Sequence, residues 1–227
     1  MIKNFPGFCV SADENPQVLL LEPIDDKDIA FLHRELDFLH AQSGIPFVFA
    51  GVLIEDWNRD LTPWASAPVW GKEAFGDRAD DTLHRIQADI LPFLEAQYPA
   101  LAGAPRILGG YSLAGLFALW ASYESALFDG IAAASPSVWY PGWREYIGSH
   151  YSHANHVYLS LGEAEPKSRN KTVATVGEVI REQERLLSAQ GTETVLIWNP
   201  GNHFTEADLR TAKAFLWAMT RLIPSRP

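Results

Sequence analysis

The stretch Gly109-Gly110-Tyr111-Ser112-Leu113-Ala114-Gly115 stands between two segments of contrasting character. Residues 106–110 before it, Arg-Ile-Leu-Gly-Gly, are typical of a short strand, and residues 114–125 behind it are rich in Ala and Leu, as a buried helix is. A serine at a sharp turn from strand to helix presents its hydroxyl at the edge of the sheet. The stretch therefore predicts a nucleophile turn with Ser112 as the nucleophile, in preference to a glycine-rich turn with an incidental serine.

The residue types around Ser112 suit such a turn. The positions two residues before and after the serine are crowded and need small side chains, and Gly110 and Ala114 occupy them. The strict pattern has glycine at the second position, so Ala114 is a mild departure. Gly115 lets the helix lie close to the sheet. Because the helix begins at the serine, the backbone N–H of Leu113 is expected to donate to an oxyanion.

The rest of the chain alternates short apolar runs with longer segments of helical period, which predicts right-handed crossovers and a mainly parallel sheet covered by helices on both faces. The expected fold is an α/β-hydrolase fold that forms a single domain over residues 1–227. Residues 55–78, rich in Trp, Pro, Asp and Asn, are expected to form a long functional loop. The expected strands cover residues 18–21, 47–53, 106–110, 130–134, 156–161 and 194–198, and the expected helices cover residues 26–41, 80–97, 114–125, 173–189 and 205–222.

A serine hydroxyl needs a general base to become nucleophilic, and the chain has seven histidines. His203 lies in the segment Asn199-Pro200-Gly201-Asn202-His203-Phe204, between the last expected strand and the last expected helix, where the base of this fold belongs. We therefore expect His203 to be the base. His33, His40 and His84 lie in expected helices as surface or packing residues. His150, His153 and His156 have ligand-like spacing but no acidic partner, so no metal site is expected.

The acid that orients the histidine should follow the strand at residues 156–161, since the chain order is serine, acid, histidine. Two carboxylates stand there, in Gly162-Glu163-Ala164-Glu165-Pro166. A buried carboxylate fixes the imidazole tautomer and stabilises the imidazolium. Glu165 is the preferred candidate and Glu163 the alternative, and a dyad without an acid stays open.

Composition narrows the classes of partner. The chain has 227 residues, a formal net charge of −10 and a pI near 5.1, which disfavours nucleic acid and anionic membrane surfaces. No apolar run is long enough to span a bilayer, and the first residues do not resemble a signal peptide. The single cysteine, Cys9, suits a reducing compartment, so a cytoplasmic location is expected. We expect a small-molecule substrate, and the oligomeric state stays open.

Four local motifs, in the same chain order, resemble the putative-esterase family that includes esterase D and the enterochelin-type siderophore esterases. The resemblance covers residues 19–222. The motifs are the nucleophile turn Gly110-Tyr111-Ser112-Leu113-Ala114-Gly115-Leu116, the segment Ser135-Pro136-Ser137-Val138-Trp139-Tyr140, the acidic turn Leu161-Gly162-Glu163-Ala164-Glu165 and the histidine turn Pro200-Gly201-Asn202-His203-Phe204. The family pattern also favours Glu165 as the acid.

The resemblance implies hydrolysis of esters or thioesters through an acyl-enzyme. No cofactor and no metal are expected. Siderophore esterases cleave catecholate trilactones, which suits an aromatic cleft. Arg59 either meets an anionic group of the substrate or pairs with Asp56 or Asp60. The expected substrate-binding residues are Trp57, Arg59, Trp64, Tyr111, Trp139 and Tyr140.

The chain departs from the full fold in two respects. It begins near the third strand of a complete α/β-hydrolase sheet, so the N-terminal strands are expected to be shortened or absent. It also lacks a His-Gly-Gly oxyanion loop, so the second oxyanion donor is expected to be the backbone N–H of Ile54. Three functions are compatible with these residues: a carboxylic-ester hydrolase, which we favour, an acyltransferase with the same nucleophile, and a catalytically silent binding protein.

Overall fold

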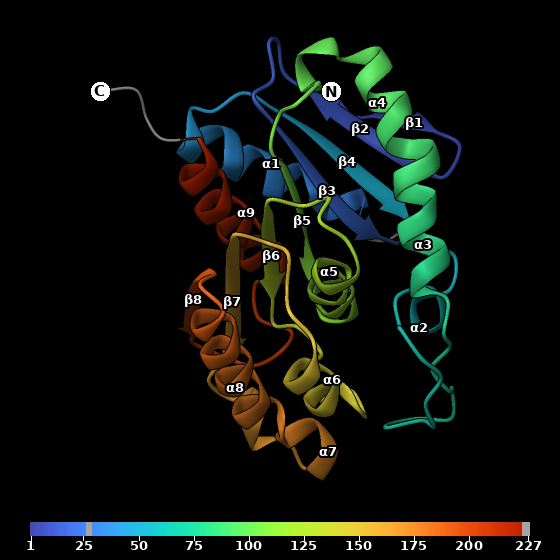
Figure 1. Ribbon diagram of the computed structural model, residues 1–227, viewed down its shortest axis with the longest axis vertical. Helices are drawn as coiled ribbons and strands as arrows, with labels where there is room; N and C mark the ends of the chain where they lie inside the picture. Colours follow the sequence, from blue (N-terminus) through green and yellow to red (C-terminus); the bar gives the residue numbers. More distant parts are fainter. Residues whose placement is uncertain (26–28, 224–227) are drawn as a thin grey trace.

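The computed structural model describes residues 1–25 and 29–223, and within them eight strands form one sheet (Figure 1). The strand order is β1-β2-β4-β3-β5-β6-β7-β8. β2 pairs antiparallel with β1 and β4, and every pairing from β4 through β3 to β8 is parallel. The strands are β1 (Lys3–Phe5), β2 (Phe8–Ala12), β3 (Val18–Ile24), β4 (Phe47–Leu53), β5 (Arg106–Tyr111), β6 (Gly130–Ala134), β7 (His156–Gly162) and β8 (Glu193–Asn199).

The two N-terminal strands are present but short. β1 has three residues and β2 has five, and they form a hairpin in which Gly7 adopts φ 79°. Of the two alternatives expected for the N-terminal strands, the structure shows that they are shortened and not that they are absent. The sequence analysis missed the hairpin because segments this short carry little periodicity.

Helices cover the two faces of the sheet (Figure 1). On one face, α1 (Ile29–Ser43) packs beside α9 (Ala207–Leu222), and their buried side chains, such as Leu36 and Phe215, share one apolar cluster. The larger cluster lies on the other face, under α3 (Ala79–Arg85), α4 (Leu91–Gln97), α5 (Leu113–Glu124), α6 (Trp143–Ser149) and α8 (Val176–Ala189). The predicted α/β-hydrolase architecture, a mainly parallel sheet covered on both faces, is confirmed.

The ends of most predicted strands and helices lie within two residues of the observed ends. The expected start of the first helix, at residue 26, lies outside the described residues. The helix expected over residues 80–97 contains a π-helical segment, Ile86–Ile90, just before Pro92, which has no N–H to donate to the carbonyl of Ala88.

Within the described residues, two shorter helices were not expected, and a third, at the start of the helix expected over residues 173–189, is separate from the rest of that helix. They are α2 (Trp57–Asp60), inside the loop after β4, α6, and α7 (Lys171–Ala174), whose end at Thr175 separates it from α8. All three have seven residues or fewer, too few for a clear helical period.

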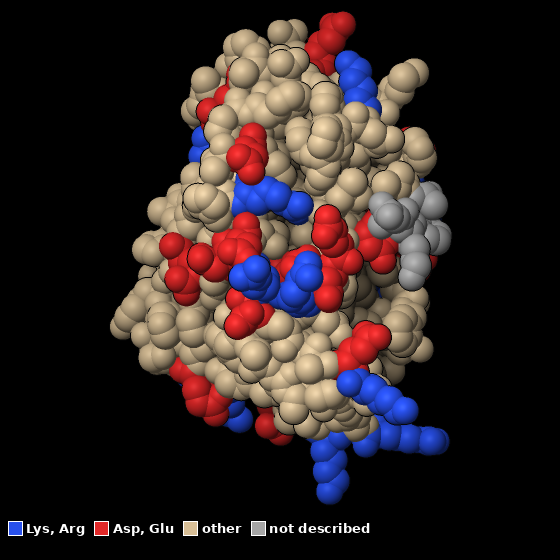
Figure 2. All heavy atoms as spheres, turned by 90° about the vertical axis from the view of Figure 1, so that its right-hand side faces the viewer, with Lys and Arg blue, Asp and Glu red and all other residues tan. Residues whose placement is uncertain are grey.

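Charged side chains are interspersed on the side of the molecule that carries α2 and α3 (Figure 2). Two ion pairs belong to these helices: Arg59 to Asp60 at 2.7 Å, and Arg78 to Asp81 at 2.9 Å. Opposite charges thus lie next to one another there. In the described part of the chain, no helix is long and apolar enough to cross a membrane.

The closeness of α9 to the sheet depends on Gly109 in β5. A Cβ atom added at Gly109 would lie 2.6 Å from the ring of Phe215 and 2.8 Å from the Cβ of Ala132. These contacts are shorter than side chains tolerate, so β5 and α9 would have to separate.

We expect Gly109→Ala to lower the free energy of unfolding by about 1–3 kcal/mol, the usual cost of overpacking a core. Urea unfolding measures this change. Gly148→Ala is the matched control, because Gly148 lies in α6 with no atom within 4 Å of the added Cβ. The control should leave stability unchanged or raise it by up to about 1 kcal/mol. Equal midpoints for Gly109→Ala and wild type would contradict the close packing.

Candidate active site

Ser112 lies at the sharp turn between β5 and α5. Its backbone has φ 58° and ψ −117°, a conformation that residues with side chains rarely adopt. A Cβ atom at Gly110 would lie 2.5 Å from the Cβ of Ala114, so the turn closes only because position 110 has no side chain. The local sequence thus produces the strained turn that it predicts.

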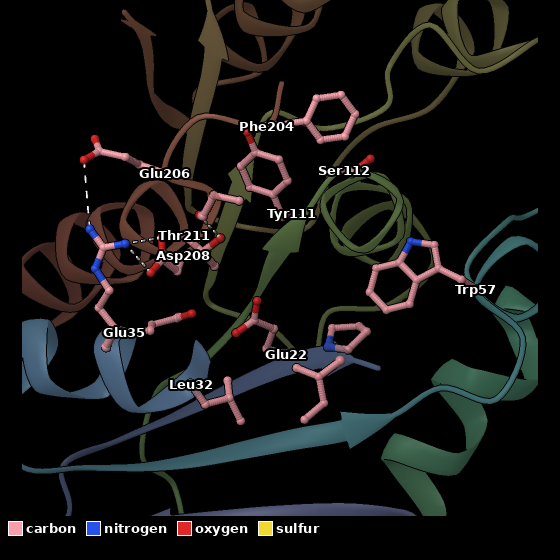
Figure 3. Close-up of a pocket in the computed structure, with 14 residues that line it drawn as sticks. Glu22, Leu32, Glu35, Trp57, Tyr111, Ser112, Phe204, Glu206, Asp208 and Thr211 are labelled. Atoms are coloured by element: carbon pink, nitrogen blue, oxygen red, sulfur yellow. Dashed lines mark hydrogen bonds and ion pairs between the residues drawn. The ribbon is translucent and has the colours of Figure 1, made fainter. Parts of the chain in front are cut away.

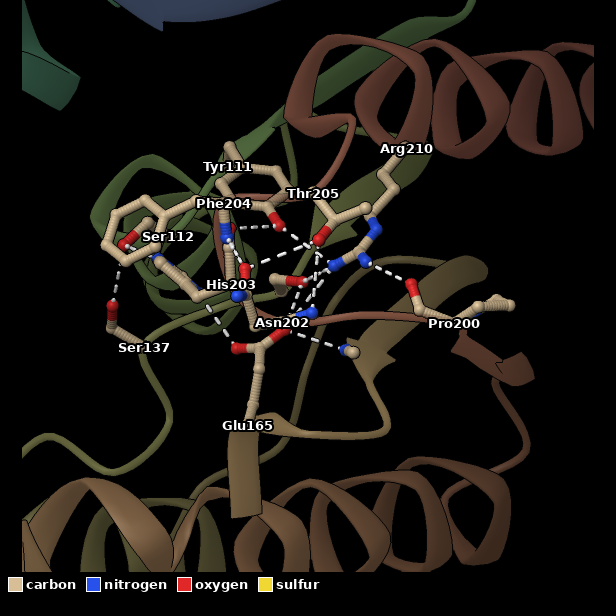
Figure 4. Close-up of polar contacts among 12 residues, drawn as sticks. Tyr111, Ser112, Ser137, Glu165, Pro200, Asn202, His203, Phe204, Thr205 and Arg210 are labelled. Atoms are coloured by element: carbon tan, nitrogen blue, oxygen red, sulfur yellow. Dashed lines mark hydrogen bonds and ion pairs between the residues drawn. The ribbon is translucent and has the colours of Figure 1, made fainter. Parts of the chain in front are cut away.

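His203 and Glu165 lie in line with Ser112 (Figure 4). The Nε2 atom of His203 is 3.0 Å from the Oγ atom of Ser112, and its Nδ1 atom is 2.8 Å from Oε2 of Glu165. A carboxylate only accepts hydrogen bonds, so Nδ1 carries the proton and Nε2 is left to accept from the serine hydroxyl. The three side chains come from the ends of β5, β7 and β8.

Of the two candidate acids, Glu165 is the one that contacts His203. Its other oxygen, Oε1, accepts from the backbone N–H of Gly162 at 2.7 Å and from the hydroxyl of Ser135 at 2.8 Å. Glu165 is buried, whereas Glu163 is exposed. The structure therefore brings Glu165 into the site and leaves Glu163 on the surface.

Arg210 of α9 is a buried cation behind the acid, and the sequence analysis did not find it. Its guanidinium lies 3.6 Å from Oε1 of Glu165, donates to the carbonyl of Pro200 at 2.8 Å and donates to the Tyr111 hydroxyl at 3.1 Å. Burial raises the pKa of the Tyr111 phenol, which stays protonated and donates to the carbonyl of His203 at 2.8 Å. Arg210 thus joins the acid, the nucleophile turn and the histidine turn (Figure 4).

Ser137 is a second hydroxyl beside the nucleophile. Its Oγ atom is fully buried and lies 3.2 Å from Oγ of Ser112, and its N–H donates to the carbonyl of Ser112 at 3.0 Å. Because the proton of Ser112 is directed at His203, the hydroxyl of Ser137 is the donor in the contact between the two serines. The segment that contains Ser135 and Ser137 therefore supports both the nucleophile and the acid.

The two expected oxyanion donors differ in availability. Leu113 is the first residue of α5, and backbone N–H groups in the first turn of a helix have no partner within the helix. The N–H of Ile54, however, donates to the carbonyl of Ile24 at 2.9 Å. The expectation for Ile54 is wrong, because the parallel ladder of β3 and β4 continues one residue beyond β4 and uses this N–H.

In the part of the chain that the structure describes, two large cavities include Ser112 in their walls. The first, which we call the Trp57 lobe, has a volume of about 480 Å³ and is lined by Trp57, Tyr111, Phe204 and the end of β3 (Figure 3). The second, the Trp139 lobe, has a volume of about 580 Å³ and is lined by His203, Trp70 and Trp139. Trp57 and Tyr111 thus line one of the two lobes beside Ser112, and Trp139 lines the other.

Three other expected contact residues do not line either lobe, and the structure corrects their assignment. Trp64 donates from its indole N–H to the carbonyl of Pro141, and the Tyr140 hydroxyl donates back to the carbonyl of Trp64, so both fasten the long loop to the segment after β6. The Arg59 guanidinium binds Asp60 through two hydrogen bonds, at 2.7 and 3.1 Å. Of the two roles left open for Arg59, the structure shows the ion pair.

Trp70 and Phe204 line the cavities but were not proposed. Trp70 lies in the long loop after β4 and its side chain is 51% exposed, and Phe204 follows His203 and is 88% exposed. Both rings lie in the walls of cavities that also include the nucleophile. The available sequence signal was the tryptophan-rich composition of the loop, which does not say which rings face the site.

The histidines outside the site have local partners. His150 contacts the carbonyl of Tyr146 at 2.8 Å, and His156 contacts Glu193 at 3.1 Å. In the described ranges 1–25 and 29–223, no group of three or more His, Cys, Asp or Glu side chains is placed to hold a metal ion.

The fold and this serine, histidine and glutamate arrangement define an α/β-hydrolase with a nucleophile turn. The model of the family described as "Putative esterase" matches residues 48–197, about two thirds of the chain. The chain belongs to this family and is a carboxylic-ester hydrolase. A search of curated proteins finds no match.

Solved structures share the fold at low sequence identity. Siderophore hydrolase EstA from Aspergillus nidulans is 20% identical with a TM-score of 0.76, over 95% of this chain and 90% of that one. An IroE-like serine hydrolase from Shewanella oneidensis is 15% identical with a TM-score of 0.74, over 92% and 74%. The enterobactin esterase FES from Shigella flexneri is 14% identical with a TM-score of 0.65, over 95% and 56%. These likenesses establish the fold.

We expect Arg210→Lys to lower the free energy of unfolding by about 1–3 kcal/mol, because an ammonium group cannot reach Pro200, Tyr111 and Glu165 together and leaves buried acceptors unpaired. Thermal and urea unfolding measure this loss. Arg78→Lys changes the same residue type in an exposed ion pair and should stay within about 0.5 kcal/mol of wild type. Equal effects of the two substitutions would argue against the bridging role of Arg210.

Proposed function

We propose that the protein hydrolyses a carboxylic ester through an acyl-enzyme formed on Ser112. The observation that carries this proposal is the continuous hydrogen-bonded line from Ser112 through His203 to Glu165. A general base meets the geometric requirement for catalysis when its acceptor atom lies within about 2.6–3.2 Å of the atom that carries the proton.

The reaction has two halves. His203 takes the proton of Ser112 as Oγ attacks the ester carbonyl, and the N–H of Leu113 donates to the oxyanion that forms. The tetrahedral intermediate collapses as His203 returns that proton to the alcohol oxygen, so the alcohol leaves and the acyl group stays on Ser112. Water, deprotonated by His203, then attacks the acyl carbon; as the bond to Oγ of Ser112 breaks, His203 gives that proton to Oγ, and the carboxylic acid leaves. Glu165 stabilises the imidazolium in both halves.

We propose a small aromatic or siderophore-type ester as the substrate. Two of the similar structures are named as a siderophore hydrolase and an enterobactin esterase, which motivates this substrate class. Support from this chain comes from the Trp139 lobe, where the rings of Trp70 and Trp139 meet edge to face with centroids 4.6 Å apart. Such a surface favours flat, aromatic groups.

Removal of the Ser112 hydroxyl should abolish turnover. We expect Ser112→Ala to lower kcat for p-nitrophenyl acetate by a factor that can reach about 10⁶, and to prevent covalent labelling by a fluorophosphonate. Intact-mass spectrometry of the labelled protein, followed by peptide mapping, identifies the modified residue. A wild-type protein no faster than Ser112→Ala would refute the proposed mechanism.

Glu165 and Glu163 provide a matched pair of substitutions. Glu165→Gln keeps the shape of the side chain but favours the wrong histidine tautomer, and kcat should fall by roughly 10⁴-fold. Glu163→Gln removes an exposed charge that does not contact His203, and kcat should change less than about twofold, as is usual for surface substitutions. Steady-state kinetics of the two variants, with circular dichroism to verify folding, tests the assignment. Similar losses in both variants would count against it.

A further inference from the structure

The two lobes of the site differ in their relation to His203. Ser112 and Phe204 line both of them, so the nucleophile lies at their junction. His203 lines the Trp139 lobe, and the described lining of the Trp57 lobe does not include it. The close-up of the Trp57 lobe shows Ser112 and Trp57 on its wall, with Phe204 at the margin (Figure 3).

This asymmetry matters because the two halves of an ester separate during the reaction. When the C–O bond to the alcohol breaks, the alcohol oxygen takes a proton from Nε2 of His203, so that oxygen must lie within about 2.6–3.2 Å of Nε2. The acyl carbon stays bonded to Oγ of Ser112. Its chain must therefore extend away from the histidine.

On the basis of the proposed function, we propose that the Trp139 lobe binds the alcohol half of the ester and the Trp57 lobe binds the acyl half. The alcohol leaves past Trp70 and Trp139. The acyl group remains against Trp57 until water releases it.

The walls of the Trp139 lobe suit an aromatic alcohol. Trp139 is 6% exposed and packs on Phe75, so it forms a fixed wall, whereas Trp70 presents a half-exposed ring whose plane is inclined at 63° to that of Trp139. The loop that carries Trp70 is fastened by a hydrogen bond of 2.6 Å from the amide of Asn170 to the carbonyl of Val69. A flat group can therefore stack on Trp70 in a largely preformed site.

The wall of the Trp57 lobe has an apolar part beside carboxyl side chains such as that of Glu22, and the apolar part suits an acyl chain. Pro23, Ile24 and Leu32 line it together with the indole of Trp57. Asp208 lies farther from Ser112 (Figure 3) and pairs with Arg34 at 3.0 Å, so opposite charges meet on that wall. An acyl chain of several carbons would cover the apolar part.

The roles of the two lobes can be tested independently with two series of esters and two variants. The first series keeps the butyryl group and varies the alcohol: it compares 2-naphthylmethyl butyrate with ethyl butyrate. The second has a constant alcohol, p-nitrophenyl hexanoate against p-nitrophenyl acetate. The value of kcat/KM includes every step up to and including acylation. The ratio of kcat/KM for the two esters of a series therefore reports how well the enzyme binds the half of the ester that differs between them. Each variant is compared with wild type by this ratio.

We expect Trp70→Ala to lower the naphthylmethyl-to-ethyl ratio roughly tenfold, the order of magnitude of a lost aromatic contact, and to leave the hexanoate-to-acetate ratio unchanged within about twofold. Trp57→Ala should do the opposite, with a lower hexanoate-to-acetate ratio and an unchanged naphthylmethyl-to-ethyl ratio. Tyr151→Ala removes an aromatic ring that is 74% exposed and lines neither lobe, and should leave both ratios unchanged.

The proposal would be overturned if Trp70→Ala lowered the hexanoate-to-acetate ratio and Trp57→Ala lowered the naphthylmethyl-to-ethyl ratio. It would also be overturned if each variant changed both ratios equally, or if neither variant changed either ratio. Fluorophosphonate labelling of Ser112 in all variants keeps this outcome separate from failure of the proposed function. If Ser112 is labelled and the ratios disagree, the assignment of the lobes is wrong. If wild-type Ser112 is not labelled and no ester is hydrolysed, both proposals fall.

Discussion

The strained backbone of Ser112 is the constraint on which the rest of the site depends. A residue held at φ 58° between a strand and a helix persists only where its surroundings fix it. Here the Ser112 N–H donates to the carbonyl of Ala134 at 3.2 Å, and the Ser112 carbonyl accepts from the N–H groups of Leu116 and Ser137, each at 3.0 Å. Hydrogen bonds from β6, from α5 and from the segment after β6 thus stabilise the turn. The same bonds direct the hydroxyl away from the sheet and toward His203.

A second constraint is the burial of charge behind the histidine. Burying a carboxylate is costly unless donors surround it, and Glu165 receives donors from Gly162, Ser135 and His203, with Arg210 close by. Because these groups come from β7, the segment after β6, the histidine turn and α9, the network couples the acid to most of the elements at this edge of the sheet. The histidine ring is thereby held in one tautomer and one orientation before a substrate arrives, and such preorganisation lowers the cost of reaching the transition state.

The sequence predicted the parts of this arrangement that have local signatures. The strand at residues 47–53 and the strand at residues 130–134 coincide with the observed β4 and β6, because buried parallel strands are continuous apolar runs. Ser112, Glu165 and His203 each follow a strand, so chain order alone places them at one edge of the sheet. Arg210 was not predictable in this way, because a cation inside an amphipathic helix usually faces solvent. Ile54 was misassigned because the last hydrogen bond of a parallel ladder leaves no trace in the sequence.

The aromatic residues show why chemistry was easier to predict than specificity. Trp57, Trp64 and Trp70 lie in the segment between β4 and α3, yet Trp57 lines one lobe, Trp70 lines the other, and Trp64 donates its indole N–H to Pro141 and fastens the loop. Tertiary contacts decide these roles. The nucleophile, base and acid are held by buried hydrogen bonds, whereas Trp70 and Phe204 are exposed and contribute little to the core. Changes at such exposed positions alter which ester fits at little cost in stability. One triad can therefore serve different substrates on this fold, and the identity of the substrate has to be read from the loops that form the two lobes.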